Sequence, residues 1–239
     1  MKFLNALALA AAVLFAAPAA AQTEADFIAA FAGDWLTFEP SLSSSGQCQV
    51  VLDQARNEIG YTVSTTGCAG PLVDLGGWGI VNNQLALLDS EGAIRVRLGG
   101  NQTRMTGDTA DGRAVIFERA GTPGRAITAA GISSGTCIYL GYTASCAEVA
   151  ALEAPAFDDD DLPQARILVD LNARAEARPD ANVVATIPQN TCVALEQCLE
   201  ASDGRWCRAQ VADTGAWIRQ QVVRRGQWPA LTYVNGCAR

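Results

Sequence analysis

The segment 33–119 consists of short runs of β-favouring residues, each ended by residues typical of tight turns. The turn segments are Asn82-Asn83, Ser90-Glu91-Gly92, Gly99-Gly100-Asn101 and Asp111-Gly112. Short strands at roughly 8–12-residue spacing with such turns are typical of antiparallel sandwiches and barrels. About eight candidate strands can be counted, enough to close a small barrel filled by its own side chains. We therefore predict an all-β fold that begins with an eight-stranded antiparallel barrel.

The chain has eight cysteines, all after the apolar N-terminal run. They are Cys48, Cys68, Cys137, Cys146, Cys192, Cys198, Cys207 and Cys237. An even number of cysteines in an exported chain indicates a disulfide framework. Metal binding is the competing interpretation, but no two cysteines are spaced Cys-x-x-Cys and the chain has no histidine. We predict structural disulfides, no metal site and no cofactor.

One disulfide pairing follows from a predicted hairpin. Cys198 and Cys207 are equidistant from a turn centred at 202–203, so an antiparallel hairpin places them opposite each other. That pairing leaves Cys192 for Cys237. Other pairings stay open, because connectivity cannot be deduced from a sequence.

Residues 1–21 have the pattern of a signal peptide. Lys2 supplies the positive charge, an apolar run follows over 3–17, and Ala19-Ala20-Ala21 offers a small-residue cleavage site. The apolar run is shorter than the about 20 residues that span a membrane. We expect cleavage after Ala21 and a soluble periplasmic or secreted protein that begins at Gln22 and has no membrane span.

The charge and residue types exclude several function classes. Removal of Lys2 changes the balance from 17 basic against 25 acidic groups to 16 against 25, a net charge of −9. Nucleic-acid binding and polybasic membrane contact both need a basic face. The absence of histidine excludes Ser-His-Asp and Cys-His catalysis, and no phosphate loop or dinucleotide motif is present. We predict no catalytic residues and no enzyme, with a hydrolase that uses carboxylates alone as the alternative.

Several landmarks stand in a fixed order along residues 22–120. They are Gly33-Asp34-Trp35-Leu36, Cys48 in QCQVVLD, Cys68 in TTGCAGP, Gly76-Gly77-Trp78-Gly79, Leu85-Ala86-Leu87-Leu88-Asp89 and Val115-Ile116-Phe117-Glu118-Arg119. In this order and spacing, the segment resembles the bacterial alkaline proteinase inhibitor (Inh) family. The alternative is another small secreted β-barrel with one disulfide.

The resemblance implies a function for the mature N-terminus. In that family, an N-terminal arm enters the active-site cleft of a secreted zinc metalloprotease of the serralysin type, and its first residue approaches the zinc. Carried over to this chain, the arm comprises Gln22, Thr23, Glu24, Ala25 and Asp26. An extended segment in a protease groove gains main-chain hydrogen bonds as an added strand would. The alternative is that residues 22–26 are a frayed terminus.

The resemblance also implies a disulfide between Cys48 and Cys68. A bond that closes a loop of about 20 residues stabilises the fold by roughly 3 kcal/mol. Trp35 and Trp78 are expected in the barrel core, since tryptophan more often packs than binds, although binding aromatics are the alternative.

Residues 121–165 differ in composition from the predicted barrel. They are poor in bulky apolar residues, and Cys137 and Cys146 bracket a short Tyr-Leu-Gly-Tyr segment. Four consecutive aspartates at 158–161 favour a solvated linker, because a calcium loop of the EF-hand type needs different spacing. We interpret 121–165 as a disulfide-pinned loop and an acidic linker. The loop belongs either to the first domain or to the start of the second.

Residues 166–239 contain a second set of landmarks. They are LNARAEARPDANVVATIPQNTCVALEQ, the strand Gly204-Arg205-Trp206-Cys207-Arg208-Ala209, and Gly215-Ala216-Trp217-Ile218. This segment resembles a bacterial SH3-like (SH3b) domain. Such domains bind cell-wall peptides or partner proteins through a shallow aromatic groove, which implies the ligand candidates Trp206, Trp217, Trp228 and Tyr233. The first two are equally suited to a core.

The sequence thus predicts an SH3-like barrel after the first barrel, and a protein that inhibits a secreted or periplasmic zinc metalloprotease. The SH3b domain would bind the envelope, through cell-wall peptide or a protein. The alternative function is a non-inhibitory periplasmic module that binds the cell wall or a protein.

Overall fold

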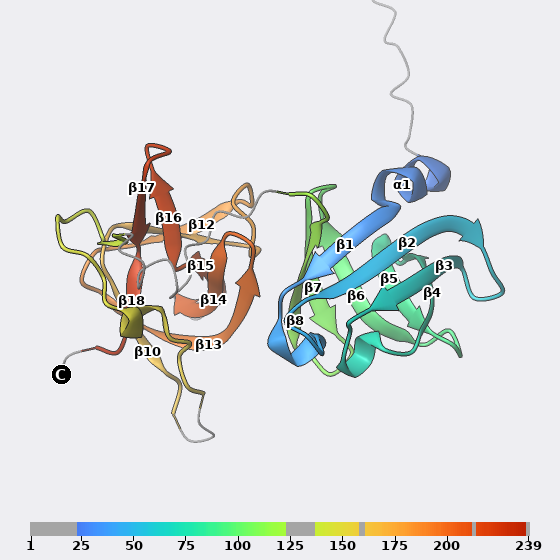
Figure 1. Cartoon of the computed structure of the whole chain (residues 1–239), viewed down its shortest axis with the longest axis horizontal. Coiled ribbons are helices and arrows are strands. Elements are labelled where there is room, and N and C mark those ends of the chain that lie inside the picture. Colours follow the sequence, from blue (N-terminus) through green and yellow to red (C-terminus); the bar gives the residue numbers. More distant parts are fainter. Residues whose placement is uncertain (1–22, 123–136, 158–160, 212–213, 238–239) are drawn as a thin grey trace, which may run out of the picture.

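The computed structural model describes residues 23–122, 137–157, 161–211 and 214–237. These residues form two units that lie side by side, a closed barrel and a C-terminal unit built from two sheets (Figure 1). The predicted all-β class and the eight-stranded antiparallel barrel are confirmed. The predicted signal peptide and Gln22 lie outside the described residues.

The barrel follows the chain in order, and β8 closes it by pairing with β1. Its strands are β1 (Gly33–Thr37), β2 (Cys48–Arg56), β3 (Tyr61–Thr66), β4 (Leu75–Val81), β5 (Gln84–Asp89), β6 (Ile94–Gly100), β7 (Arg104–Thr109) and β8 (Ala114–Arg119). Helix α1 (Glu24–Phe31) precedes β1, and the one-turn helices η1 (Pro40–Leu42) and η2 (Gly70–Leu72) follow β1 and β3. Asn82 and Asn83, with φ of 50° and 64°, form the turn between β4 and β5, as expected for a tight hairpin turn.

Both tryptophans of the barrel lie in its core. Trp35 and Trp78 are 0 % exposed, which confirms the prediction. Each indole N–H has a backbone acceptor at 2.9 Å, the carbonyl of Phe31 for Trp35 and that of Asp53 for Trp78. Both buried indole N–H groups therefore have a hydrogen-bond acceptor.

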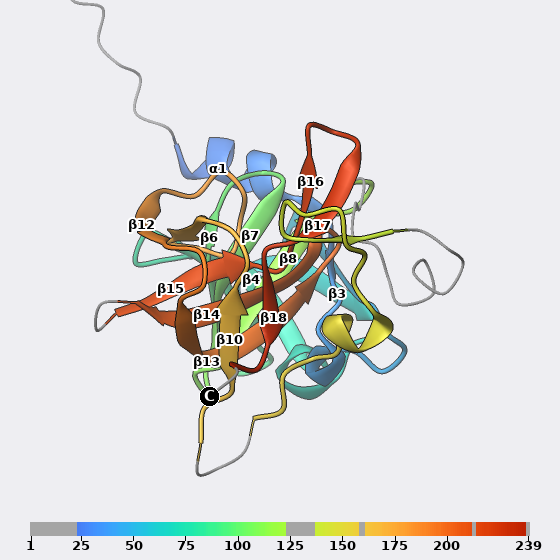
Figure 2. The same cartoon turned by 90° about the vertical axis from the view of Figure 1, so that its left-hand side faces the viewer.

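The C-terminal unit combines a seven-stranded and a three-stranded sheet. The larger sheet, in the order β12-β11-β15-β14-β13-β10-β18, contains β10 (Gln164–Ile167), β11 (Leu171–Arg174), β12 (Val183–Ile187), β13 (Cys192–Ala201), β14 (Gly204–Val211), β15 (Thr214–Arg219) and β18 (Tyr233–Asn235). The smaller sheet, in the order β16-β17-β9, contains β9 (Tyr139–Leu140), β16 (Gln221–Arg224) and β17 (Trp228–Leu231). In the region predicted to be an SH3-like barrel, the described residues thus form these two sheets, and the closed barrel is the one of β1–β8 (Figure 2).

All four predicted disulfides are present: Cys48–Cys68, Cys137–Cys146, Cys192–Cys237 and Cys198–Cys207. Cys198 and Cys207 lie directly opposite each other in the β13–β14 hairpin, as the turn position predicted. Four disulfides fit a protein of an oxidising compartment, periplasmic or secreted. In the part of the chain that the structure describes, no helix is long and apolar enough to span a membrane.

The segment 137–157 belongs to the C-terminal unit, one of the two alternatives for the disulfide-pinned loop. Strand β9 pairs in parallel with β17, and Ile138 packs with Leu152 and Leu231 in one apolar cluster. The one-turn helix η3 (Val149–Leu152) completes this segment. The C-terminal unit therefore begins before residue 166. Of the predicted acidic linker, 158–160 lie outside the described residues and Asp161 is exposed.

Strand β8 is buried on both faces because the C-terminal unit covers its outer side. Val115 and Phe117 point into the barrel core, whereas Ala114 and Ile116 join a cluster with residues of the other unit. The partners in that cluster are Ala177, Leu199, Ala201 and Trp206, with Trp217 at its margin. The two units thus share a small apolar core.

A buried ion cluster surrounds this shared core. Arg104 pairs with Glu118 on the barrel and with Asp203 of the C-terminal unit, the latter at 2.7 Å. Arg219 contacts the second oxygen of Asp203 at 2.7 Å, and the backbone N–H of Ser202 donates to Glu118 at 3.1 Å. Burial alone would raise the pKa of Asp203, but Arg104 and Arg219 outweigh it and hold that pKa below its ordinary value. Asp203 therefore stays ionised between the two arginines.

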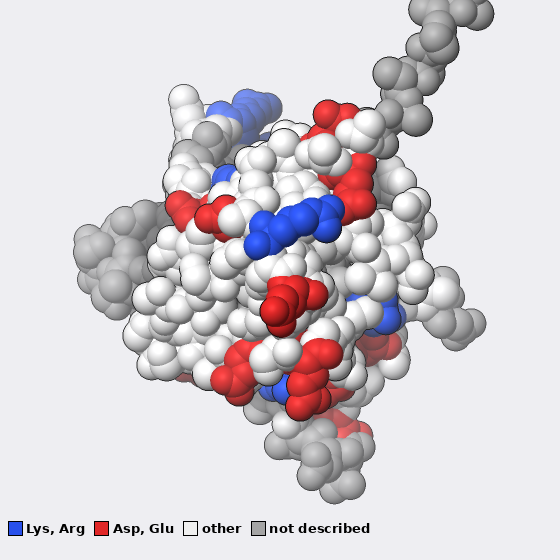
Figure 3. All heavy atoms as spheres, turned by 90° about the vertical axis from the view of Figure 1, so that its right-hand side faces the viewer, with Lys and Arg blue, Asp and Glu red and all other residues white. Residues whose placement is uncertain are grey.

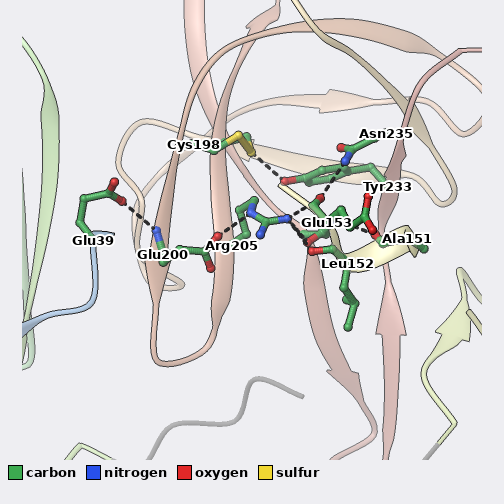
Figure 4. Close-up of a disulfide and its surroundings, with 11 residues drawn as sticks. Glu39, Ala151, Leu152, Glu153, Cys198, Glu200, Arg205, Tyr233 and Asn235 are labelled. Carbon is green, nitrogen blue, oxygen red and sulfur yellow. Dashed lines mark hydrogen bonds and ion pairs between the residues drawn. A yellow bond between two sulfur atoms is a disulfide. The ribbon is translucent and has the colours of Figure 1, made fainter. Parts of the chain in front are cut away.

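A second contact between the units joins the carboxylate of Glu39 to the backbone of Glu200 (Figure 4). Glu39, beside η1, accepts a hydrogen bond at 3.4 Å from the backbone N–H of Glu200. The side chain of Glu200 pairs at 2.6 Å with Arg205, whose guanidinium also donates to the carbonyls of Leu152 and Glu153 at 3.0 and 2.8 Å. Burial, with a smaller contribution from the Glu200 charge, raises the pKa of Glu39.

We predict that Arg104→Ala lowers the free energy of unfolding by about 3–5 kcal/mol, because it leaves Glu118 and Asp203 buried with less compensation. The control Arg113→Ala removes the cation of an exposed pair with Asp111 and should cost less than about 1 kcal/mol. Urea unfolding of both variants measures the difference. Equal losses would contradict a cluster that joins the units.

Glu39→Gln should stabilise the protein at pH 7 by up to about 1 kcal/mol. The raised pKa means that ionised Glu39 is disfavoured in the fold, so its contribution is present below the ordinary value of 4.5 and is lost as pH rises through the native pKa. Glutamine keeps the acceptor without the charge, so the gain should vanish near pH 4. Urea unfolding at both pH values tests this, with exposed Glu58→Gln as the control. A loss of stability at pH 7 would contradict it.

Candidate functional site

The predicted protease-binding segment forms the first turn of α1. Thr23 is the N-cap, with its hydroxyl accepting from the Asp26 backbone N–H at 3.2 Å while the Asp26 carboxylate accepts from the Thr23 N–H at 3.0 Å. These hydrogen bonds lower the pKa of Asp26. In the free protein, Glu24–Asp26 are therefore helical rather than extended, because a reciprocal capping box favours the helix here.

The side chains of this first turn are on the surface. Thr23, Glu24, Ala25 and Asp26 are all exposed, at the end of the barrel where α1 projects (Figure 1). Glu24 makes two tertiary contacts, an ion pair of 3.1 Å with Arg56 and a hydrogen bond of 3.3 Å donated by the Tyr61 hydroxyl, and the side chains of the ion pair are 59 % and 66 % exposed. An exposed pair of this kind contributes between about 0 and 1 kcal/mol. The first turn is thus ordered locally and held only weakly to the barrel.

The second half of α1 is packed firmly on the barrel. Ile28 is buried in the barrel core. Phe27 stacks on Phe31 with ring centroids 4.3 Å apart, and Phe31 stacks in turn on Trp35 at 6.3 Å. The structure therefore divides the segment before β1 at Phe27, with an exposed part before it and a fixed part after it.

Arg119 fixes the end of the helix and accounts for the glycine that opens the first landmark of this chain. Its guanidinium donates to the carbonyls of Ala30 and Ala32 at 2.7 and 2.6 Å and lies 4.4 Å from the centre of the Trp35 ring. A Cβ on Gly33 would come within 2.5 Å of this guanidinium, and Gly33 has a φ of 124°. Glycine at this position therefore lets Arg119 reach both the helix carbonyls and the tryptophan.

Two of the SH3b ligand candidates are inside the protein. Trp206 is 1 % exposed and Tyr233 is 0 % exposed. Trp206 lies in the core shared with β8 and donates to Asp203 at 3.0 Å, while the Tyr233 hydroxyl donates to the Cys207 sulfur at 3.0 Å (Figure 4). Their prediction as ligand contacts is wrong for this structure, because the shared core covers the first and the C-terminal unit's own core covers the second.

The other two candidates reach the surface. Trp217 is half-buried at the margin of the shared core, and Trp228 is 43 % exposed. Trp228 lines a groove with Tyr142, Arg224 and Arg225, which the sequence analysis did not single out. The sequence feature that could have indicated this groove is the presence of Tyr139 and Tyr142 within the short Cys137–Cys146 loop. The structure brings this loop against the β16–β17 hairpin.

The described residues offer no metal centre. No group of three or more His, Cys, Asp or Glu side chains in the described ranges is placed to hold an ion. On the barrel face turned away from the C-terminal unit, basic side chains form small separate groups between acidic ones (Figure 3). That face has no continuous basic patch of the kind that binds a nucleic acid. The candidate surfaces are therefore the exposed first turn of α1 and the groove beside Trp228.

No protein-family model matches the chain, and a search of curated proteins finds no relative.

We predict that Gly33→Ala lowers the free energy of unfolding by about 1–3 kcal/mol and exposes the end of α1. The new methyl group displaces the Arg119 guanidinium, and alanine is strained at the positive φ of this position. Gly79→Ala is the control, because a Cβ there meets nothing within 4 Å and should change stability by at most about 0.5 kcal/mol. Urea unfolding, with hydrogen exchange of residues 27–32, reports both effects. Unchanged exchange in Gly33→Ala would show that Arg119 does not hold the helix.

Proposed function

We propose that this protein is an exported inhibitor of a secreted zinc metalloprotease of the serralysin type. It acts as a plug, with residues 22–26 in the active-site cleft and the barrel rim against the protease, and no bond is made or broken. The observation that carries the proposal is the exposed first turn of α1 in front of a closed, disulfide-linked barrel. The resemblance to the Inh family supplies the class of target.

The division of the N-terminal segment at Phe27 supports this mechanism. Of the residues expected in the cleft, 23–26 are described by the structure, and all four are exposed. The residues after Phe27 are fixed by Ile28 and by stacking on Trp35. A cleft would therefore receive a short, accessible segment whose base is packed on the barrel, which lowers the ordering cost of binding.

For the segment to bind as an added strand, the first turn of α1 must unwind. That step breaks the capping box between Thr23 and Asp26, worth about 1 kcal/mol. It also breaks the contacts of Glu24, an exposed pair with Arg56 worth at most about 1 kcal/mol and a hydrogen bond from Tyr61 worth about 1 kcal/mol. A nanomolar complex has a binding free energy of about 12 kcal/mol. The helical turn is thus a small obstacle to entry into a cleft.

In this proposal the C-terminal unit holds the inhibitor at the envelope or on a partner. The buried cluster around Arg104 keeps it on β8, away from the barrel end that carries α1 (Figure 1). A second binding module on the same body raises the effective concentration of the first near a shared target.

A non-inhibitory envelope-binding module is the second candidate function. The exposure of Trp228 and Tyr142, at 43 % and 55 %, favours it. In that case the barrel is a stable scaffold, the C-terminal unit binds a cell-wall or protein ligand, and α1 has no part in binding.

A titration of the mature, disulfide-bonded protein against a serralysin-type protease tests the proposal. The plug mechanism predicts a stoichiometric loss of protease activity and no loss for a serine protease control. A variant without residues 22–26 should lose inhibition by at least about 100-fold, since extended main-chain contacts to the cleft are removed. Its thermal unfolding midpoint should fall only slightly, because the deleted side chains are exposed.

Inhibition that persists after the deletion of residues 22–26 would contradict the plug mechanism. A lack of inhibition of any zinc protease from the same source would favour the envelope-binding module.

A further inference from the structure

A groove of about 420 Å³ lies between the Cys137–Cys146 loop and the β16–β17 hairpin. Two exposed aromatic side chains line it, Tyr142 from the loop and Trp228 from the hairpin, 55 % and 43 % exposed, together with the half-buried Tyr139. Single exposed aromatic residues are common, but two that line one groove are typical of a binding surface. Tryptophan, tyrosine and arginine are also the residues most enriched at interface hot spots.

Two exposed arginines line the same groove. The guanidinium of Arg224 lies 4.6 Å from the centre of the Tyr142 ring, and Arg225 follows at the hairpin tip. Among the described residues, neither arginine has a carboxylate within ion-pair distance, and the groove lining contains no acidic side chain. On a chain with a net charge of −8, this groove is a local site of positive charge.

The backbone at the hairpin tip is in a conformation that disfavours arginine. Arg225 has a φ of 49° and Gly226 a φ of 70°. Asparagine, aspartate and glycine are the usual residues where a tight hairpin turn requires positive φ, and a longer side chain there costs stability. Strain of this kind at an exposed residue points to a role for its side chain outside the fold.

The opposite wall of the groove is held rigid. The Cys137–Cys146 disulfide closes the loop, and Gly141, with a φ of 59°, donates from its backbone N–H to the Leu231 carbonyl at 2.9 Å. The Thr143 hydroxyl donates to the Leu140 carbonyl at 2.7 Å. A ligand would therefore find Tyr142 already in place, which lowers the entropy cost of binding.

The lining chemistry selects among ligand classes. Two unpaired guanidinium groups favour a carboxylate, which they can bind in bidentate fashion. The aromatic faces favour an apolar side chain next to that carboxylate. The groove has no acidic side chain to bind a basic ligand and no acidic or amide side chain to order the hydroxyl groups of a neutral sugar.

We propose that this groove binds an acidic peptide segment of a protein partner. Carboxylates of the segment pair with Arg224 and Arg225, and an adjacent apolar side chain packs between Tyr142 and Trp228. The proposal goes beyond protease inhibition and does not depend on it, since the residues belong to the C-terminal unit and binding is measured without a protease.

Selection from a random peptide library displayed on phage, with the full-length mature protein as bait, tests the proposal. The enriched peptides should combine Asp or Glu with apolar residues, and their affinity, measured by calorimetry, should fall as ionic strength rises. Trp228→Ala and Arg225→Asn should each weaken binding at least about tenfold, in line with hot-spot residues.

Arg225→Asn separates loss of binding from loss of fold. Asparagine tolerates the positive φ of this turn, so the variant should unfold at the same temperature as the parent or above it. The control Arg166→Asn removes one exposed positive charge from β10, outside the groove lining, and should leave affinity unchanged.

Enrichment of peptides without acidic residues, or of peptides that bind the parent and Arg225→Asn equally, would overturn the proposal. A library that yields no binder specific to the parent would also overturn it. Binding to vesicles of anionic lipid that is lost in Trp228→Ala, without any selected peptide, would assign the groove to a membrane surface instead.

Discussion

The buried ion cluster around Arg104 determines how the two halves of this protein are arranged. Its guanidinium holds Glu118 of the barrel and Asp203 of the C-terminal unit, and Arg219 completes the cluster from the far side. A buried carboxylate is tolerated only with such partners, so the contact has little freedom to shift. The apolar cluster of Ile116 and Trp206 lies beside it. The outer face of β8 is therefore covered by the C-terminal unit, so a binding partner must contact other surfaces of the protein.

Two exposed features are the first turn of α1 on the barrel and the groove with Tyr142 and Trp228 on the C-terminal unit. The helix and the β16–β17 hairpin project from the same side of the molecule in both views (Figures 1 and 2). Each has a rigid base, formed by Ile28 and the Trp35 stack for the helix and by a disulfide-closed loop for the groove. This arrangement suits a protein that presents short elements to partners without rearranging its fold.

Much of this fold follows from local sequence patterns. Turn residues such as Asn82-Asn83 mark the strand ends, and the equal distance of Cys198 and Cys207 from their turn determines their pairing. The shared core was harder to predict, because a run such as Val115-Ile116-Phe117 shows that both faces are covered but not by what. Trp206 therefore looked available to a ligand. The groove was not predicted because its residues, around 142 and 225, are far apart in the sequence. The parallel pairing of β9 with β17 brings them together.

In the proposed mechanism, a partner protease takes up the exposed segment before Phe27. Hydrogen exchange of the mature protein, alone and with an equimolar serralysin-type protease inactivated at its catalytic residue, tests it most directly. The account predicts strong new protection of the amides over 23–28 and no change in the core strands, since the barrel binds without rearrangement. Protection confined to other parts of the protein, with 23–28 exchanging as in the free state, would contradict it.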